Sequence, residues 1–327
     1  MKRPKSKQND NKLLASLKLI SSILDNDGHS WQTHVLLQDN WASAHNGIIG
    51  IGEYIDETLY AAPNAIMLRN ALAKCGDTIS ITQLETKLSV KSGKFRALIP
   101  CIPPENLTRA FPDPIQAQIN NSLRSALEAV APVPIDENRT VTASFLLYNG
   151  CAFSTDGKII LQAWHGLSLP TLVLPKSVLS PIAKCNKDLI GIGFSDTSCT
   201  FHFENNTWIK TQLFETPWPN VNHILNKEPI LRTLPEGFYD AVNALEPFSD
   251  DGNIYFETNK MLTHSSDEKG ASYEVYGLPS GPMFNIKQLK LVEPYMKKVD
   301  FMVEHHNSKM LYFQSDTVRG CIAGRAE

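Results

Sequence analysis

The sequence lacks the features that would mark a metal protein, a membrane protein or an enzyme of a familiar class. Its six cysteines form no CxxC pair, its nine histidines form no HExxH motif, and neither a nucleophile elbow nor a phosphate-binding loop occurs. No apolar run approaches the ~18 residues that a membrane-spanning helix needs, and the N-terminus has no signal-peptide core. We therefore expect a soluble, cytoplasmic protein that is not an enzyme, holds no metal or cofactor, and binds partners through its surface.

The composition also lacks a basic excess. The chain has 31 Lys and Arg against 34 Asp and Glu, a formal net charge of −3. Affinity for a nucleic-acid backbone comes mainly from Lys and Arg, so this sum looks wrong for a DNA-binding protein. The distribution of charge matters more than the sum, however. Basic residues gather in two segments, Lys2, Arg3, Lys5 and Lys7 in the first and Lys287, Lys290, Lys297 and Lys298 in the second.

Three prolines at nearly equal spacing indicate an internal repeat. Pro63, Pro175 and Pro282 are separated by 112 and 107 residues. Each stands near the start of an apolar helical segment, where the missing N–H of proline costs nothing because first-turn donors have no acceptor within the helix. Alternating strands follow each segment. The spacing predicts three similar units of about 110 residues, which we delimit as 1–113, with a mobile basic N-terminus, 114–227 and 228–327.

Apolar periodicity predicts a further helix in each unit. Residues 11–24, 115–130 and 236–245 place apolar side chains at helical spacing, and Pro294 should end the regular part of the third proline-started helix. Together with the strands these helices predict an α+β fold, with two helices packed on antiparallel sheets in each unit. The segments predicted as strands are 31–37, 42–51, 59–62, 79–81, 87–90, 94–99, 140–147, 151–153, 159–164, 189–194, 199–203, 208–214, 254–257, 261–264, 272–276, 300–304, 310–314 and 318–322.

Motifs in the middle unit carry a resemblance to a known family. STDGKII at 154–160, VLPKSVL at 173–179 and WPNVNHIL at 218–225, which TQLF precedes, resemble the middle domain of the bacterial DNA polymerase III sliding clamp. That domain has an ATDGHRL-like turn, an IVPRK-type helix start and an FPDYRRVL-like exit in this order. SVKSGKFR at 89–96 is similar to the family's VRSGRSRF hairpin, and the third unit is similar in pattern. Such divergence suits a phage-encoded or otherwise remote clamp.

The resemblance implies the DNA clamp fold and a function in DNA replication. In that family three similar domains form each chain, and two chains close head to tail into a ring around duplex DNA. The implied protein is a homodimeric processivity factor that encircles DNA without sequence preference and tethers the replicative polymerase, the clamp loader and other clients. Basic residues beside the apolar stripes would then face the channel and attract phosphates diffusely. The residues expected to bind DNA are Lys12, Lys18, Arg69, Lys74, Arg124, Arg139, Lys176, Lys184, Lys287, Lys290 and Lys297.

The resemblance also implies a pocket for a short hydrophobic client peptide, between the second and third domains. Ile159 and His223 replace basic residues of the family pattern there, and the Met-Pro-Met-Arg C-terminus of the family becomes residues 321–325. Carried over by position, the pocket residues are Val141, Thr155, Gly157, Lys158, Ile159, Ile160, Pro219, His223, Ile224, Cys321 and Ala323.

Two other functions remain open from the residues alone. A repeat-built, β-rich structural or assembly protein that does not bind DNA would show the same periodicity. A hydrolase could use Asp156 and His165, although no activated nucleophile accompanies them. The Asp156-Gly157 pair is also what an ordinary hairpin turn requires.

Overall fold

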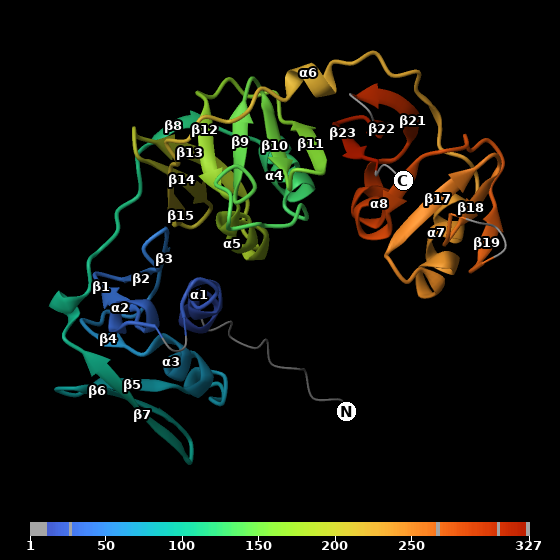
Figure 1. The fold of residues 1–327 in the computed structure, drawn as a ribbon. Helices are drawn as coiled ribbons and strands as arrows, with labels where there is room; N and C mark the ends of the chain where they lie inside the picture. Colours follow the sequence, from blue (N-terminus) through green and yellow to red (C-terminus); the bar gives the residue numbers. More distant parts are fainter. Residues whose placement is uncertain (1–11, 26–27, 266–268, 306–307, 325–327) are drawn as a thin grey trace, which may run out of the picture. The chain divides into compact units, whose positions relative to one another are not determined.

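The computed structural model, drawn in Figure 1, describes residues 12–25, 28–265, 269–305 and 308–324. The chain divides into two compact units. Unit 1 comprises Met1–Asn121 and Ser177–Leu213, and unit 2 comprises Ser122–Lys176 and Phe214–Glu327. The predicted middle domain therefore contributes to both units. The predicted mobile N-terminus lies outside the described residues, and the division into three domains stays a prediction.

A seven-stranded antiparallel sheet forms the core of unit 1. Strands β3 and β15 come from distant parts of the chain and pair from Gly52 opposite Trp208 to Ile49 opposite Thr211. A Cβ atom on Gly52 would lie 2.3 Å from the Trp208 side chain, so this close approach requires glycine. In sheet order the strands are β1 Leu36–Gln38, β2 Trp41–His45, β3 Ile49–Tyr54, β15 Thr207–Gln212, β14 Ser198–Phe203, β13 Leu189–Phe194 and β8 Ile115–Gln118.

A four-stranded sheet and several helices complete unit 1. The sheet runs β4 Ala62–Pro63, β7 Phe95–Ile102, β6 Lys87–Ser92 and β5 Ser80–Gln83. Because β4 pairs only with the last two residues of β7, the rest of that edge of β7 pairs with no strand in the described part of the chain. The helices are α1 Lys12–Ile20, α2 Ser30–Thr33, α3 Ala65–Leu72, η1 Pro104–Asn106, η2 Lys176–Val178 and α5 Leu179–Lys184.

An eight-stranded antiparallel sheet forms the core of unit 2. Here β11 and β23 join distant parts of the chain, from Ile159 opposite Ile322 to Ala163 opposite Val318. In sheet order the strands are β12 Leu172–Pro175, β9 Ser144–Tyr148, β10 Cys151–Thr155, β11 Ile159–Trp164, β23 Val318–Ala323, β22 Ser308–Gln314, β21 Lys298–His305 and β16 Arg232–Thr233.

A second four-stranded sheet belongs to unit 2. It runs β19 Ser272–Glu274, β18 Lys260–Leu262, β17 Asn253–Glu257 and β20 Met283–Asn285, with β19 at one edge. None of the helices that the structure describes is both long and apolar enough to cross a membrane. The helices of unit 2 are α4 Asn121–Val130, α6 Asn222–Leu225, α7 Phe238–Leu245, η3 Glu246–Phe248, α8 Ile286–Val292 and η4 Glu293–Tyr295.

The structure corrects the role predicted for the three prolines. Pro63 and Pro175 end β4 and β12, and Pro282 comes just before β20, so none of them starts a helix. The fixed φ of proline also suits the end of a strand. Helices α3 and α8 begin after Asn64 and Asn285, whose side chains accept hydrogen bonds from first-turn N–H groups at 3.0 and 3.1 Å. These asparagine N-caps, not the prolines, set the helix starts.

Other predicted elements are confirmed, shortened or wrong. The strands at 159–164 and 189–194 are confirmed to the residue. The predicted helix 115–130 is wrong in its first part, because Ile115 lies in β8 and α4 begins only at Asn121. The segment predicted as a strand from residue 31 starts as helix α2. As predicted, the regular helix before Pro294 ends there, since α8 stops at Val292.

Candidate functional site

Unit 2 contains a cavity of ≈ 580 Å³ that gathers most of the predicted pocket residues. We call it the client pocket. Seven further residues that were not predicted for this pocket also line it: Arg139, Thr140, Thr142, Thr216, Asn220, Val221 and Met310. The ten predicted residues around it are Val141, Thr155, Gly157, Lys158, Ile160, Pro219, His223, Ile224, Cys321 and Ala323.

A tight turn between β10 and β11 builds one wall of the client pocket. Thr155 lies opposite Ile160 and closes the hairpin, which places both side chains on one face. The Asp156 carboxylate accepts hydrogen bonds from the N–H groups of Lys158 and Ile159, both at 2.8 Å. The Thr155 hydroxyl accepts one from the N–H of Gly157, whose φ of +88° favours glycine. The turn is thus fixed by its own side chains.

Ile159 belongs to the opposite face of the sheet. Its side chain is completely buried, and it pairs with Ile322 in the core of unit 2. Because successive side chains of a strand point to opposite faces, Ile160 can line the pocket only if Ile159 does not. The prediction of Ile159 as a pocket residue is therefore wrong.

The exit segment from residue 216 onward builds the opposite wall. Trp218 donates a hydrogen bond from its indole N–H to the Ser144 hydroxyl at 2.9 Å, and the Tyr312 hydroxyl donates to the carbonyl of Ile224. Val221 and Leu225 are buried against the sheet, whereas Ile224 is half-buried and faces the pocket. The segment is therefore held to the sheet at both ends of α6. Alternation along β22 could have identified Met310 and Tyr312, since both stand on the face that α6 covers.

Lys176 stabilises the turn from the protein interior and cannot bind DNA. Its side chain is only 2% exposed, and its Nζ donates hydrogen bonds to the carbonyl oxygens of Thr155 at 2.7 Å and Pro134 at 3.0 Å. Burial lowers the pKa of Lys176 to about 8, although the Asp156 carboxylate acts in the opposite direction. The prediction of Lys176 as a DNA-binding residue is wrong, because a phosphate cannot reach its ammonium group.

The other predicted DNA-binding residues fall into three groups. Arg139 lines the client pocket and is not on a helix. Lys18, Lys74, Lys184 and Lys287 are exposed at helices or their ends, and Arg69 is half-exposed on α3. Four others form ion pairs: Lys12 with Asp56 at 3.0 Å, Arg124 with Glu128 at 3.0 Å, Lys290 with Glu246 at 2.6 Å and Lys297 with Asp316 at 2.6 Å.

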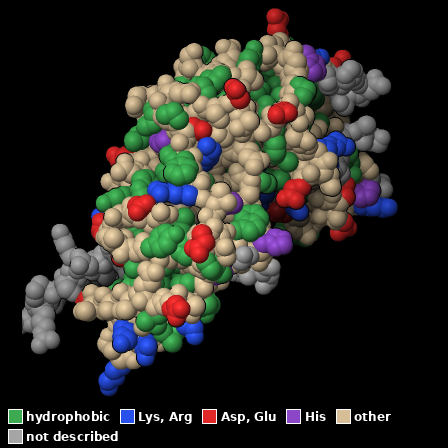
Figure 2. Space-filling view, turned by 90° about the vertical axis from the view of Figure 1, so that its left-hand side faces the viewer, with side chains coloured by type: hydrophobic (Ala, Val, Ile, Leu, Met, Phe, Trp, Pro, Cys, Tyr) green, Lys and Arg blue, Asp and Glu red, His purple; other side chains and the backbone are tan. Residues whose placement is uncertain are grey.

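Charges of both signs are mixed on the surface. On the face drawn in Figure 2, Lys and Arg side chains are scattered among Asp and Glu, and several gather at its lower end. Because four of the predicted cations already face carboxylates, their attraction for phosphate is reduced. Such a surface can attract a polyanion only weakly and diffusely.

Asp156 and His165 do not form a catalytic pair. Strand β11 separates them and by itself spans about 16 Å at 3.3 Å per residue. The Asp156 carboxylate is engaged by the turn, and Nδ1 of the buried His165 accepts the N–H of Leu167 at 3.1 Å. Burial lowers the pKa of His165. The hydrolase alternative has no support in this geometry.

No protein-family model matches the sequence, and no curated protein matches it. Solved structures do match. The β clamp of Helicobacter pylori bound to a DNA ligase peptide has a TM-score of 0.77 at 17% identity, covering 97% of this chain and 98% of that one. The sliding clamp (DNA polymerase III subunit beta) of Pseudomonas aeruginosa bound to griselimycin gives 0.80 at 14% identity, covering 98% of both chains.

A putative DNA polymerase III beta subunit from Eubacterium rectale is similar to the same degree, with a TM-score of 0.78 at 15% identity and 96% of each chain covered. All three likenesses extend over nearly the whole chain, so they include both units. At this identity a likeness establishes the fold. The predicted fold class is confirmed: the chain has the α+β DNA clamp fold of the bacterial sliding clamps.

Proposed function

We propose that the protein is a DNA sliding clamp, a non-enzymatic processivity factor that encircles duplex DNA and tethers the replicative polymerase and other clients. One observation carries this proposal. Residues chosen from a sequence resemblance alone gather around one cavity of a chain that has the clamp fold.

We infer that the client pocket binds an apolar segment of a partner. Ile160, Ile224 and Met310 offer apolar surface, and the exposed Pro219 stiffens the rim. Burying one Leu or Phe side chain there would contribute roughly 1.5–3 kcal/mol. The replicative polymerase and the clamp loader are the partners expected from this function, in the cytoplasm of a bacterium or of a bacterial host.

We further infer that the chain has three domains, 1–113, 114–227 and 228–327. Two chains would then close a ring by pairing their short sheets. The argument comes from the strands that join the predicted domains: one strand of a domain pairs with the last strand of the next domain. β3 pairs with β15, and the corresponding β11 pairs with β23. By the same relation the open edge of β19 would pair, antiparallel, with the open edge of β7 in a second chain. Arg96 and Leu98, exposed on one face of β7, would then lie beside exposed Glu274 on β19.

Light scattering tests the ring. We expect a mass of two chains, where one chain is 36.4 kDa. Leu98→Arg should shift the protein toward monomer, because it places a charge in the joint, whereas Leu84→Arg on the exposed loop after β5 should not. A wild-type monomer at micromolar concentration would refute the dimeric ring.

Retention on DNA tests the function itself. The protein loaded on circular DNA should stay bound through a high-salt wash and leave when the circle is linearised, since only a topological tether shows that behaviour. Reversing the charge of Lys18, Arg69, Lys74, Lys184 and Lys287 together should weaken DNA association and flatten its salt dependence. Equal retention on circular and linear DNA would sink the clamp proposal and favour a structural protein instead.

A further inference from the structure

A second cavity lies on the same sheet face as the client pocket. Side chains at alternate positions of β11 point to one face, so Ile160, Gln162 and Trp164 share it. Ile160 lines the client pocket, whereas Gln162 and Trp164 line a separate cavity of ≈ 880 Å³. On β23, Arg319 lines this second space, which we call the Arg319 cavity. The two cavities adjoin α6 on different sides, since Ile224 lines the first and Asn226 lines the second.

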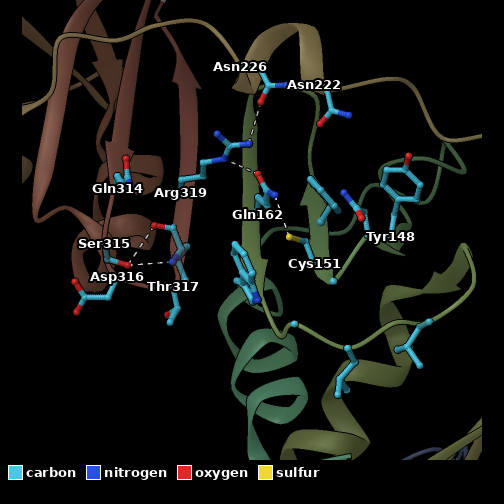
Figure 3. A pocket seen from close by; sticks show the side chains of 18 of the residues that line it. Tyr148, Cys151, Gln162, Asn222, Asn226, Gln314, Ser315, Asp316, Thr317 and Arg319 are labelled. Atoms are coloured by element: carbon cyan, nitrogen blue, oxygen red, sulfur yellow. Dashed lines mark hydrogen bonds between the residues drawn. The ribbon is translucent and has the colours of Figure 1, made fainter. Parts of the chain in front are cut away.

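The guanidinium group of Arg319 is held in place by neutral groups. Its Nε donates to the side-chain carbonyl of Gln162 at 2.6 Å, and an Nη donates to that of Asn226 at 3.1 Å (Figure 3). Among the described residues, no carboxylate lies within ion-pair distance of Arg319. Asp316 also lines the cavity, but its carboxylate pairs with Lys297 at 2.6 Å. The fixed guanidinium of Arg319 therefore has only neutral hydrogen-bond partners in the described structure, and such a group is well suited to bind a carboxylate.

Aromatic and amide side chains complete the Arg319 cavity. Trp164 is 67% exposed and Tyr148 is 44% exposed, a large apolar area left in contact with water. Asn149, Asn222 and Gln314 add side-chain amides, which can both donate to and accept from a peptide main chain. A bound segment would thus find an apolar contact, main-chain partners and one cation.

We propose that the Arg319 cavity is a second docking site for clients, and that it binds a carboxylate of the same client segment whose apolar side chain fills the client pocket. This inference rests on the proposed clamp function. A single cation matches one Asp or Glu side chain, whereas single-stranded DNA would need a row of cations along its backbone. Gln162, which lies opposite Arg319, is two residues from Ile160 along β11, about 7 Å. An extended client chain needs at least about two residues to span it.

Binding of synthetic peptides tests this proposal. The probes are fluorescein-labelled peptides with a Leu-Phe pair and a single Glu placed two to eight residues before or after it, each matched by a peptide with Gln in place of Glu. Fluorescence anisotropy with the full-length protein should show that the best Glu peptide binds about tenfold more tightly than its Gln match, about 1.4 kcal/mol. Arg319→Gln should abolish this ratio. The same change at an exposed arginine of β16, Arg232→Gln, should leave it intact.

The outcomes separate the two proposals. Loss of all peptide binding in Ile224→Asp, with the Glu preference present in the wild-type protein, would support both sites. Equal binding of Glu and Gln peptides to the wild type, or a preference that survives in Arg319→Gln, would overturn the Arg319 site alone. Failure of every peptide to bind the wild type would overturn the client pocket and this inference together. A single-stranded oligonucleotide that bound instead, and was lost in Arg319→Gln, would replace the peptide by nucleic acid and overturn the proposal.

Discussion

The two long sheets are joined in the same way, and the two cavities described above both lie at the joint of unit 2. Strands β3 and β15 form the joint of unit 1, and β11 and β23 form that of unit 2. The preceding hairpins close with His45 opposite Gly50 and with Thr155 opposite Ile160. Gly50 therefore corresponds to Ile160, and by the same register Trp208 corresponds to Arg319.

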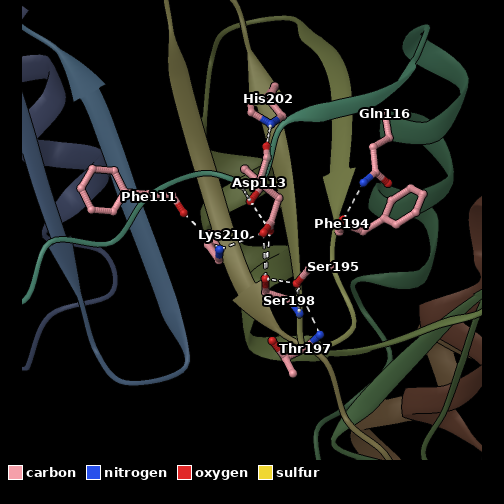
Figure 4. A network of polar contacts seen from close by, with 10 residues as sticks. Phe111, Asp113, Gln116, Phe194, Ser195, Thr197, Ser198, His202 and Lys210 are labelled. Atoms are coloured by element: carbon pink, nitrogen blue, oxygen red, sulfur yellow. Dashed lines mark hydrogen bonds and ion pairs between the residues drawn. The ribbon is translucent and has the colours of Figure 1, made fainter.

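In unit 1 the joint is filled. Trp208 is only 4% exposed, and its indole occupies the space beside Gly50 and Gly52. Lys210 then holds the chain before β8 against the sheet, donating to the Phe111 carbonyl at 3.1 Å and to the Asp113 carboxylate at 3.0 Å (Figure 4). The indole of Trp208 thus fills the position beside two glycines, and Lys210 fixes the chain that passes over the sheet.

In unit 2 the corresponding positions are occupied differently. Ile160 and Gln162 replace the two glycines, and Cys321 and Arg319 replace Lys210 and Trp208. The segment that crosses this face is held by Trp218 and Tyr312 near α6, so space remains on both sides of the helix. The comparison shows that the same pairing of distant strands can be covered by an aromatic side chain, as in unit 1, or can leave cavities beside it, as in unit 2. A few side chains decide between the two.

The largest expected effect comes from placing two charges in the client pocket at the joint of unit 2. Ile160→Asp combined with Ile224→Asp should abolish client binding and polymerase stimulation, because each change places a charge where an apolar side chain would be buried. The loss should exceed about 100-fold, since the pocket would forgo more than one buried side chain. Ring mass and retention on circular DNA should stay unchanged.

Ile190→Asp provides a control in unit 1, since Ile190 is 38% exposed on β13 and lines neither cavity. Because Ile160 is 8% exposed, thermal unfolding must accompany the binding assay. If the double variant folded, assembled and still supported processive synthesis, clients would have to bind elsewhere.

A smaller effect is expected from removing the charge of Asp113, whose carboxylate holds the chain before β8 against the sheet of unit 1. The Asp113 carboxylate also accepts hydrogen bonds from Ser198 and Thr200, at 3.0 and 2.8 Å. Asp113→Asn should lower the free energy of unfolding by about 1.5–3 kcal/mol at pH 7, the usual value for hydrogen bonds to a charged group. Urea unfolding measures it, and Asp196→Asn in an exposed turn of the same sheet should change little.

The same variant gives a pH signature. Burial alone would raise the pKa of Asp113. Hydrogen bonds from Lys210, Thr200 and Ser198 lower this pKa by more than burial raises it, so it lies below the ordinary value. The stabilisation is complete above the unfolded pKa of about 3.9 and is lost as the pH falls from there through the folded pKa. The difference in free energy of unfolding between the wild type and Asp113→Asn should therefore shrink in that acid range. An advantage that did not shrink as the pH fell below the unfolded pKa would contradict the ion-pair role.

The smallest effect concerns the lysine beneath the client pocket. Lys176→Met leaves the Thr155 and Pro134 carbonyls without their donor and removes a buried charge, so the opposing terms should leave a loss of about 1 kcal/mol at pH 7. Because the pKa of Lys176 is about 8 in the folded protein against 10.5 ordinarily, the unfolded chain binds more protons between these values. Wild-type stability relative to the variant should rise across that range. A flat difference would show that Lys176 is not buried as described.

The sequence by itself determined the class of fold and much of the local structure. Alternation fixed β11 and β13 to the residue, because a half-buried strand must place every second side chain on the apolar face. The turn at Asp156 and Gly157 was also readable, since its geometry depends on side chains within the turn. The motif resemblance placed ten pocket positions that the structure gathers around one cavity.

Only the tertiary structure decided how the units are divided and which basic residues reach the surface. The pairing of β3 with β15 and of β11 with β23 joins segments more than 150 residues apart, and such register depends on packing that no local pattern encodes. Lys176 and the exposed Lys74 are alike in sequence character, yet burial makes one a structural support. Whether a joint is open or closed depends on Trp208 fitting beside Gly52, a contact that exists only once the distant strands have met.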